Sequence, residues 1–139
     1  MNGGDTFRLS GVADRHTWVV ISDPAQDPNK VLIVSFTSYT GEVGMDASCV
    51  VETDEFSILT NRSCIYYEDL REASVTSLEL IKKGGKLQMR GPVSAALLRK
   101  IRDGAISSIE CKEKYKDLLK KQGVVTSGLA RTLDRPDNL

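Results

Sequence analysis

Two groups of reactive side chains stand at the ends of neighbouring predicted strands. Arg15 and His16 lie at the start of the apolar segment His16–Ser22, and Thr37 and Ser38 close the next one, Val31–Ser38. If these strands pair antiparallel, an imidazole, a guanidinium and hydroxyls gather at one rim. Such groups suit phosphodiester chemistry, because Arg binds phosphate in a bidentate way and His transfers protons at neutral pH. The alternative is that His16 is an ordinary polar residue at a strand start.

The chain carries none of the common catalytic or metal-binding signatures. It has no P-loop, no G-x-G-x-x-G, no G-x-S-x-G and no H-E-x-x-H. The cysteines Cys49, Cys64 and Cys111 are widely spaced and His16 is the single histidine, so the ligands of a tetrahedral zinc site are missing. We expect three buried free thiols, no metal and no cofactor.

The first half has the pattern of short β-strands. Segments rich in β-branched and aromatic residues alternate with turns rich in Gly, Pro, Asp and Asn. The predicted strands are Asp5–Leu9, His16–Ser22, Val31–Ser38, Ser48–Glu52 and Arg62–Tyr67. Short strands at this spacing are typical of a small, strongly bent antiparallel barrel.

The second half is predicted to be mainly helical. Apolar residues recur at helical spacing over Pro92–Gly104 and Glu110–Lys121. For Ala73–Gly91 we expect a strand, a turn and a second strand. The stretch 122–139 loses periodicity and is expected to form a loose tail after a single domain of residues 1–121. The predicted fold class is therefore α+β: a small β-barrel of short antiparallel strands followed by C-terminal helices.

The formal net charge of zero hides an imbalance along the chain. Residues 1–79 carry 13 acids and 5 bases, whereas residues 80–139 carry 6 acids and 14 bases. Such asymmetry indicates either binding of a partner or internal pairing of the two halves. An acidic barrel repels RNA unless the basic half folds beside it. The segment Lys82–Arg90 and the Lys-rich helix Lys112–Lys121 are the candidates for that basic wall.

Composition also predicts the compartment. No apolar run approaches the roughly 20 residues that cross a bilayer. The first residues, Met1–Asp5, lack the basic and apolar regions of a signal peptide. We therefore expect a cytoplasmic protein with no membrane contact.

Several segments resemble one known family. Gly4–Phe7, Arg15–Ser22 and Val31–Ser38 resemble three successive strands of the MazF/PemK/Kid toxins: G-D-x-[VI], R-P-x-[LV]-V-[LI]-S, and an apolar strand ending in threonine. Ser63–Tyr67 and Val93–Ile101 are similar to PemK-like relatives, so the likeness covers roughly residues 4–110. The resemblance implies an SH3-like barrel, a homodimer, a protein antitoxin, and a metal-independent endoribonuclease in which a 2′-hydroxyl attacks the adjacent phosphate of RNA.

Position by position, the resemblance implies a set of site residues. The family threonine matches Thr37, the family arginine falls at His16 with Arg15 one place away, and the family Arg-x-Asp falls near Tyr66 and Glu68. His16 would then act as the base and Tyr66 as a weak acid, with an arginine holding the phosphate. The expected catalytic residues are His16, Thr37, Arg15, Tyr66 and Glu68, and the expected RNA-binding residues are Ser38, Arg62, Lys82, Lys83 and Lys86.

Two other functions remain open. The acidic first half and the replaced family arginines favour a catalytically inactive SH3-like barrel that binds a protein or a nucleic acid. The charge division would also suit a self-assembling protein whose acidic and basic faces meet between subunits. Salt would dissociate such an assembly, since it screens contacts between exposed charges.

Overall fold

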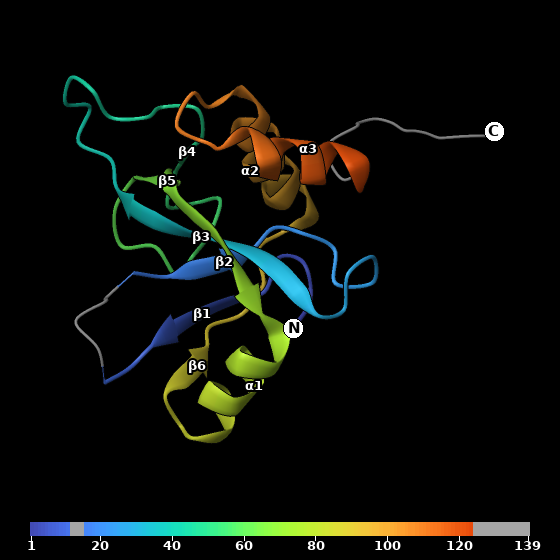
Figure 1. Ribbon diagram of the computed structural model, residues 1–139. Coiled ribbons are helices and arrows are strands. Elements are labelled where there is room, and N and C mark those ends of the chain that lie inside the picture. Colours follow the sequence, from blue (N-terminus) through green and yellow to red (C-terminus); the bar gives the residue numbers. More distant parts are fainter. Residues whose placement is uncertain (12–15, 124–139) are drawn as a thin grey trace.

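A six-stranded antiparallel sheet and three α-helices form the described part of the chain, residues 1–11 and 16–123, in a computed structural model (Figure 1). The strands are β1 (Thr6–Leu9), β2 (Trp18–Val20), β3 (Lys30–Ser38), β4 (Val50–Val51), β5 (Ser63–Ser74) and β6 (Leu87–Met89). The helices are α1 (Val75–Lys83), α2 (Ala95–Ser107) and α3 (Glu113–Lys121). The strand order across the sheet is β4-β5-β3-β2-β1-β6.

The α+β class and the antiparallel pairing predicted from the sequence are confirmed, whereas a closed barrel is not. The sheet is open, with β4 and β6 at its two edges. Both edge strands are short, at two and three residues. The strand β5, in contrast, runs for twelve residues and continues well past the predicted end at Tyr67.

The central strand β3 is apolar on both faces because both faces are covered. Leu32, Val34 and Phe36 belong to one buried cluster, and Val31 and Ile33 to another. Consecutive side chains of a strand point to opposite faces of the sheet, so alternate residues of β3 enter different clusters when both faces are buried.

The helices supply the two covers. Helices α2 and α3 pack on the first cluster through Leu97, Ile101, Tyr115 and Leu119, and α1 packs on the second through Leu78. Figure 1 accordingly shows α2 and α3 on one side of the sheet and α1 beside β6 on the other. Both predicted C-terminal helices are therefore present, with shifted boundaries.

The strand predicted at the start of Ala73–Gly91 is wrong, because that segment forms α1. Ser74 caps the helix: its hydroxyl accepts a hydrogen bond from the backbone N–H of Ser77 at 3.2 Å. Only Leu78 of α1 is buried, while Leu80 is 65% and Ile81 is 37% exposed. Because so few of its apolar residues face the core, the sequence of this segment shows only a weak helical period of apolar residues. The predicted turn and second strand are present, the latter as β6.

Most of the predicted loose tail, residues 124–139, lies outside the described part of the chain. Its first residue, Gln122, ends α3 and contacts the β2–β3 loop, where its side-chain oxygen accepts from the backbone N–H of Asp23 at 2.9 Å. None of the helices in residues 1–11 and 16–123 is long and apolar enough to cross a membrane.

Helix α2 approaches β5 closely at Gly104. A Cβ atom placed on Gly104 would lie 2.2 Å from the Tyr67 hydroxyl oxygen and 2.9 Å from the Cys49 Cβ. The Tyr67 hydroxyl also donates to the carbonyl of Ile101 at 2.5 Å, one turn earlier on the same helix. Tyr67 and Cys49 are fully buried, so neither can move aside without disturbing the core.

This contact predicts the effect of one added methyl group. Gly104→Ala is expected to lower the free energy of unfolding by about 1–3 kcal/mol, because the overpacked methyl forces Tyr67 or α2 to shift. Gly84→Ala is the matched control, since its nearest atoms are 3.5 Å away and its φ is −77°. Urea denaturation followed by circular dichroism measures both. Equal midpoints for the two variants would contradict the close approach.

Candidate functional site

Two pockets open near the end of β3, and Thr37 lines both of them. The first, which we call the basic pocket, has a volume of about 440 Å³. The second, which we call the acidic pocket, has a volume of about 420 Å³. Both are large enough for a small ligand or for one nucleotide unit of a polymer.

The basic pocket combines cationic groups with hydroxyl groups. Its charged and titratable side chains are Arg8, Arg90 and His16. No carboxylate lies among the described residues of its wall. The remaining wall residues are the polar Thr17, Thr37, Ser38, Thr60, Asn61 and Ser63 and the apolar Phe36, Ile58 and Leu59. The pocket is therefore suited to an anion, which guanidinium and hydroxyl groups bind through charge-assisted hydrogen bonds.

Strand pairing brings the two arginines together from opposite ends of the chain. Arg8 of β1 pairs with Gln88 of β6, and the backbone N–H of Arg90 donates to the carbonyl of Thr6 at 2.9 Å. Residues two apart on a strand point to the same face, so Arg8 and Arg90 lie diagonally across one face of the β1–β6 ladder. Both side chains are half-buried.

His16 enters the basic pocket through the pairing of β2 with β3. Trp18 pairs with Ser35, and the carbonyl of Thr17 accepts from the N–H of Phe36 at 3.0 Å. The Nδ1 atom of His16 lies 3.1 Å from the carbonyl oxygen of Phe36. A carbonyl only accepts, so in this hydrogen bond Nδ1 carries the proton, and the neutral ring has its lone pair on Nε2.

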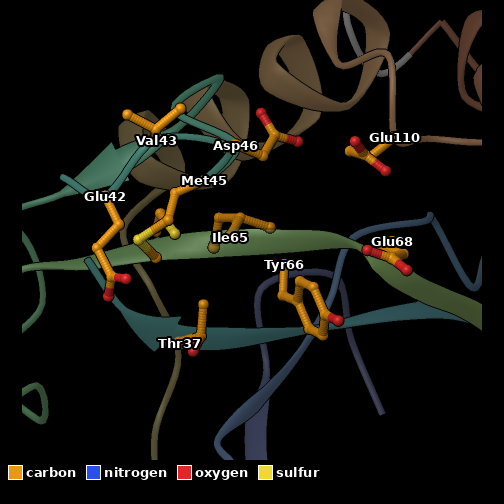
Figure 2. A pocket seen from close by; sticks show the side chains of 11 residues that line it. Thr37, Glu42, Val43, Met45, Asp46, Ile65, Tyr66, Glu68 and Glu110 are labelled. Atoms are coloured by element: carbon orange, nitrogen blue, oxygen red, sulfur yellow. The ribbon is translucent and has the colours of Figure 1, made fainter. Parts of the chain in front are cut away.

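The acidic pocket lies along β5 and the loop before β4. Figure 2 shows Thr37 and Tyr66 projecting from the adjacent strands β3 and β5, with Asp46 and Glu110 on the other side of the pocket. Its four carboxylates are Glu42, Asp46, Glu68 and Glu110, and its other wall residues are Thr37, Val43, Gly44, Met45, Cys64, Ile65 and Tyr66.

Asp46 anchors the loop that forms one wall of the acidic pocket. Burial alone raises the pKa of this carboxyl, but hydrogen bonds from the hydroxyl of Ser108 and from the hydroxyl and N–H of Ser48 outweigh it and lower the pKa below 3.8. Asp46 is therefore ionised at neutral pH and joins the loop to the end of α2.

The structure brings together some of the predicted catalytic and RNA-binding residues and separates others. His16, Thr37 and Ser38 meet in the basic pocket, as the antiparallel pairing of their strands predicted. Tyr66 and Glu68 line the acidic pocket instead, because they lie farther along β5, beyond the pairing of Thr37 with Cys64. Arg15 lies outside the described residues.

The predicted RNA-binding cations are mostly elsewhere. Arg62 forms an ion pair with Glu52 at 3.0 Å, and Lys82 and Lys83 end α1 outside the described wall of the basic pocket. Lys86 lines a separate, mainly apolar hollow with Leu80 and other residues of α1 and β1. None of these four cations belongs to the described wall of the basic pocket, and two of them, Lys82 and Lys83, belong to helix α1.

Arg8 and Arg90 are the site residues that sequence reasoning missed. They stand 82 positions apart and meet only because β1 pairs with β6. The one available signal was the position of Arg90, which ends the segment Lys82–Arg90 that was predicted to supply a basic wall. Through this one residue, the basic half of the chain does contribute to the pocket.

The three cysteines are buried free thiols, as predicted. Burial raises the pKa of Cys49 to about 11 and also raises the pKa of Cys64 and of Cys111. The thiols are therefore protonated at neutral pH and are poor nucleophiles. The described residues contain no group of three or more His, Cys, Asp or Glu side chains that could hold a metal ion.

Comparison of the chain with protein-family models found no match, and neither did comparison with curated proteins. The assignment of function therefore depends on the geometry of the two pockets and on the sequence resemblance described above.

The hydrogen bond from Ser108 to Asp46 predicts that the difference in stability between the wild type and Ser108→Ala depends on pH. Ser108→Ala is expected to lower the free energy of unfolding by about 2 kcal/mol at pH 7, since it removes two hydrogen bonds: the one that the Ser108 hydroxyl donates to Asp46 and the one that it accepts from the N–H of Glu110. A carboxyl with a lowered pKa in the folded state stabilises the fold above its unfolded pKa, and this stabilisation is lost as pH falls through the folded pKa. The part of the difference that comes from Asp46 should therefore disappear as pH falls through the lowered folded pKa of Asp46, and the part that comes from the Glu110 hydrogen bond should remain.

Urea denaturation at a series of pH values measures this difference. Ser107→Ala is the control, because the Ser107 hydroxyl donates to the carbonyl of Asp103 within its own helix. A difference between Ser108→Ala and the wild type that stays constant down to pH 2.5 would contradict the role of Asp46.

Proposed function

We propose that the protein is a metal-independent endoribonuclease of the PemK/MazF type, with the basic pocket as its catalytic site. The observation that carries this proposal is the convergence of Arg8, Arg90 and His16 with hydroxyl groups in a pocket whose described wall has no carboxylate. Cation, imidazole and hydroxyl together are what cleavage of a phosphodiester by an internal nucleophile requires.

The arginines would hold the scissile phosphate. Each guanidinium can donate two parallel hydrogen bonds to non-bridging phosphate oxygens. Their positive charge is fixed beside the phosphate before reaction, and it stabilises the additional negative charge that develops in the transition state. The hydroxyl of Thr37 is available as a further donor at the same wall.

His16 would act as the general base. With its proton on Nδ1, the imidazole can accept the proton of the ribose 2′-hydroxyl at Nε2. The 2′-oxygen then bonds to phosphorus as the bond from phosphorus to the 5′-oxygen breaks. The 5′-oxygen leaves with a proton returned by the imidazolium, and the products are a 2′,3′-cyclic phosphate and a 5′-hydroxyl.

The family resemblance supplies the proposed biological setting. A chain of this type would act as a toxin on cellular RNA and would be held inactive by a protein antitoxin. It would form a homodimer, and its open antiparallel sheet would correspond to the SH3-like barrel of the family.

One observation favours a second candidate, a binding module without catalysis. Four carboxylates line the pocket that adjoins the basic one, and they repel the phosphates of a long RNA. A protein that binds RNA at the basic pocket without cleaving it would support this alternative, and the experiment below separates the two.

Cleavage of RNA by the purified protein in EDTA tests the proposal. His16→Ala is expected to reduce the cleavage rate by a factor of about 10²–10⁴, the usual contribution of general-base catalysis. Arg90→Gln should weaken both RNA binding and cleavage, because it removes a phosphate contact. Products are identified by their 2′,3′-cyclic phosphate ends.

Lys82→Gln is the matched control, since it also removes one positive charge but at the end of α1, away from the pocket. It should cleave like the wild type. The nuclease proposal is overturned if the wild type does not cleave RNA or if His16→Ala cleaves as fast as the wild type. RNA binding without cleavage, weakened by Arg90→Gln, would establish the binding module.

A further inference from the structure

We propose that the acidic pocket is a nucleobase subsite, which takes the base next to the phosphate held in the basic pocket and prefers guanine. This inference rests on the proposed function, because it assigns the substrate part that lies beside the scissile bond. It is carried by the shared wall of the two pockets, by the exposed ring of Tyr66 and by the carboxylates around it.

The end of the β3–β5 ladder connects the two pockets. Thr37 pairs with Cys64, and both line the acidic pocket, whereas the next pair, Ser38 with Ser63, lines the basic pocket. Consecutive residues of a strand point to opposite faces, so the pockets flank the end of the ladder from its two sides. A single RNA strand that crosses this end can place a phosphate on one side and the adjoining base on the other.

Tyr66 offers the stacking surface. It projects from β5 beside Thr37 and is 39% exposed, whereas its neighbour in the chain, Tyr67, is 1% exposed and packs under α2. Aromatic side chains bind unstacked bases through their faces, and the pocket volume of about 420 Å³ lies within the range of small-ligand sites.

The four carboxylates determine which part of the nucleotide enters the acidic pocket. Phosphate is repelled by Glu42, Asp46 and the other two acids, so the backbone stays in the basic pocket and the base occupies the acidic one. Ionised carboxylates accept hydrogen bonds and cannot donate them, so they select bases that present donors.

Guanine presents the donor pattern that fits best. Its N1–H and N2 amino groups are adjacent and can donate to the two oxygens of one carboxylate. Uracil has a single N3–H between two carbonyl oxygens, which a carboxylate repels. Glu68 is the candidate acceptor, because it lines the pocket two residues after Tyr66 and its carboxylate makes no hydrogen bond or ion pair with the described residues.

Binding of short RNA tests this subsite. The probes are fluorescent hexamers with 2′-O-methyl groups, which cannot be cleaved by 2′-hydroxyl attack. One is all uridine, one has a single central guanosine, and one has inosine there, which lacks the N2 amino group. The wild type should bind the guanosine hexamer about tenfold more tightly than the uridine hexamer, with inosine between them.

Variants of Tyr66 and Glu68 test whether the preference for guanosine arises in the acidic pocket. Tyr66→Ala should weaken guanosine binding by about tenfold, and Tyr66→Phe should not, because the ring is retained. Glu68→Gln should reduce the guanosine preference to about twofold, while all three variants keep the wild-type affinity for uridine. Glu72→Gln, on the same strand but outside the pocket, is the control and should bind like the wild type.

The outcomes separate the subsite from the nuclease proposal. If the wild type binds every hexamer equally and Arg90→Gln weakens all of them, the phosphate site stands and the nucleobase subsite is overturned. If no hexamer binds to the wild type, the proposed function itself fails. If guanosine preference survives in both Tyr66→Ala and Glu68→Gln, a base is recognised elsewhere and the subsite is again overturned.

Discussion

The pairing of β3 with both β2 and β5 is the interaction on which the rest of the structure depends. Residues Val31–Phe36 of this strand are all buried, and their apolar side chains alternate between two apolar clusters. Each large side chain withdrawn from water contributes about 1.5–3 kcal/mol, so both faces of the strand must be covered. Helix α1 covers one face and helices α2 and α3 cover the other. Where this cover ends, at Thr37 and Ser38, the strand becomes polar and the two pockets open.

The division of charge along the chain persists only partly in the folded molecule. One side-chain ion pair in the described residues, Lys100 with Glu55 at 3.0 Å, joins the acidic half to the basic half. Arg90 of the basic half lies with Arg8 in a pocket formed mostly by the first half. The result is a cationic pocket and an anionic pocket that adjoin at Thr37. Together they orient a ligand that has a negatively charged group at one end and hydrogen-bond donors at the other.

Local sequence pattern was sufficient to predict most of the elements, but it could not predict which strands distant in the sequence pair with each other. The strands around His16 and Thr37 are neighbours in the chain, so their antiparallel contact could be predicted from a single loop. The meeting of Arg8 with Arg90 could not, because nothing in either segment specifies that β1 pairs with β6. Helix α1 was missed since it buries only Leu78, which leaves almost no helical period in its sequence. Tyr66 and Glu68, which were predicted to be catalytic together with His16, line the acidic pocket and not the basic one, because they lie farther along β5.

Chemical labelling of the three buried thiols can measure local opening of the native protein. Cys49 lies beneath α2, Cys64 lies in β5 near the end of its ladder with β3, and Cys111 precedes α3. A protonated, buried thiol reacts with an alkylating reagent only when its surroundings open, so each labelling rate measures the free energy of opening at one place. The chain therefore carries native probes under one helix, near the end of the central ladder and before the last helix, with no engineered label.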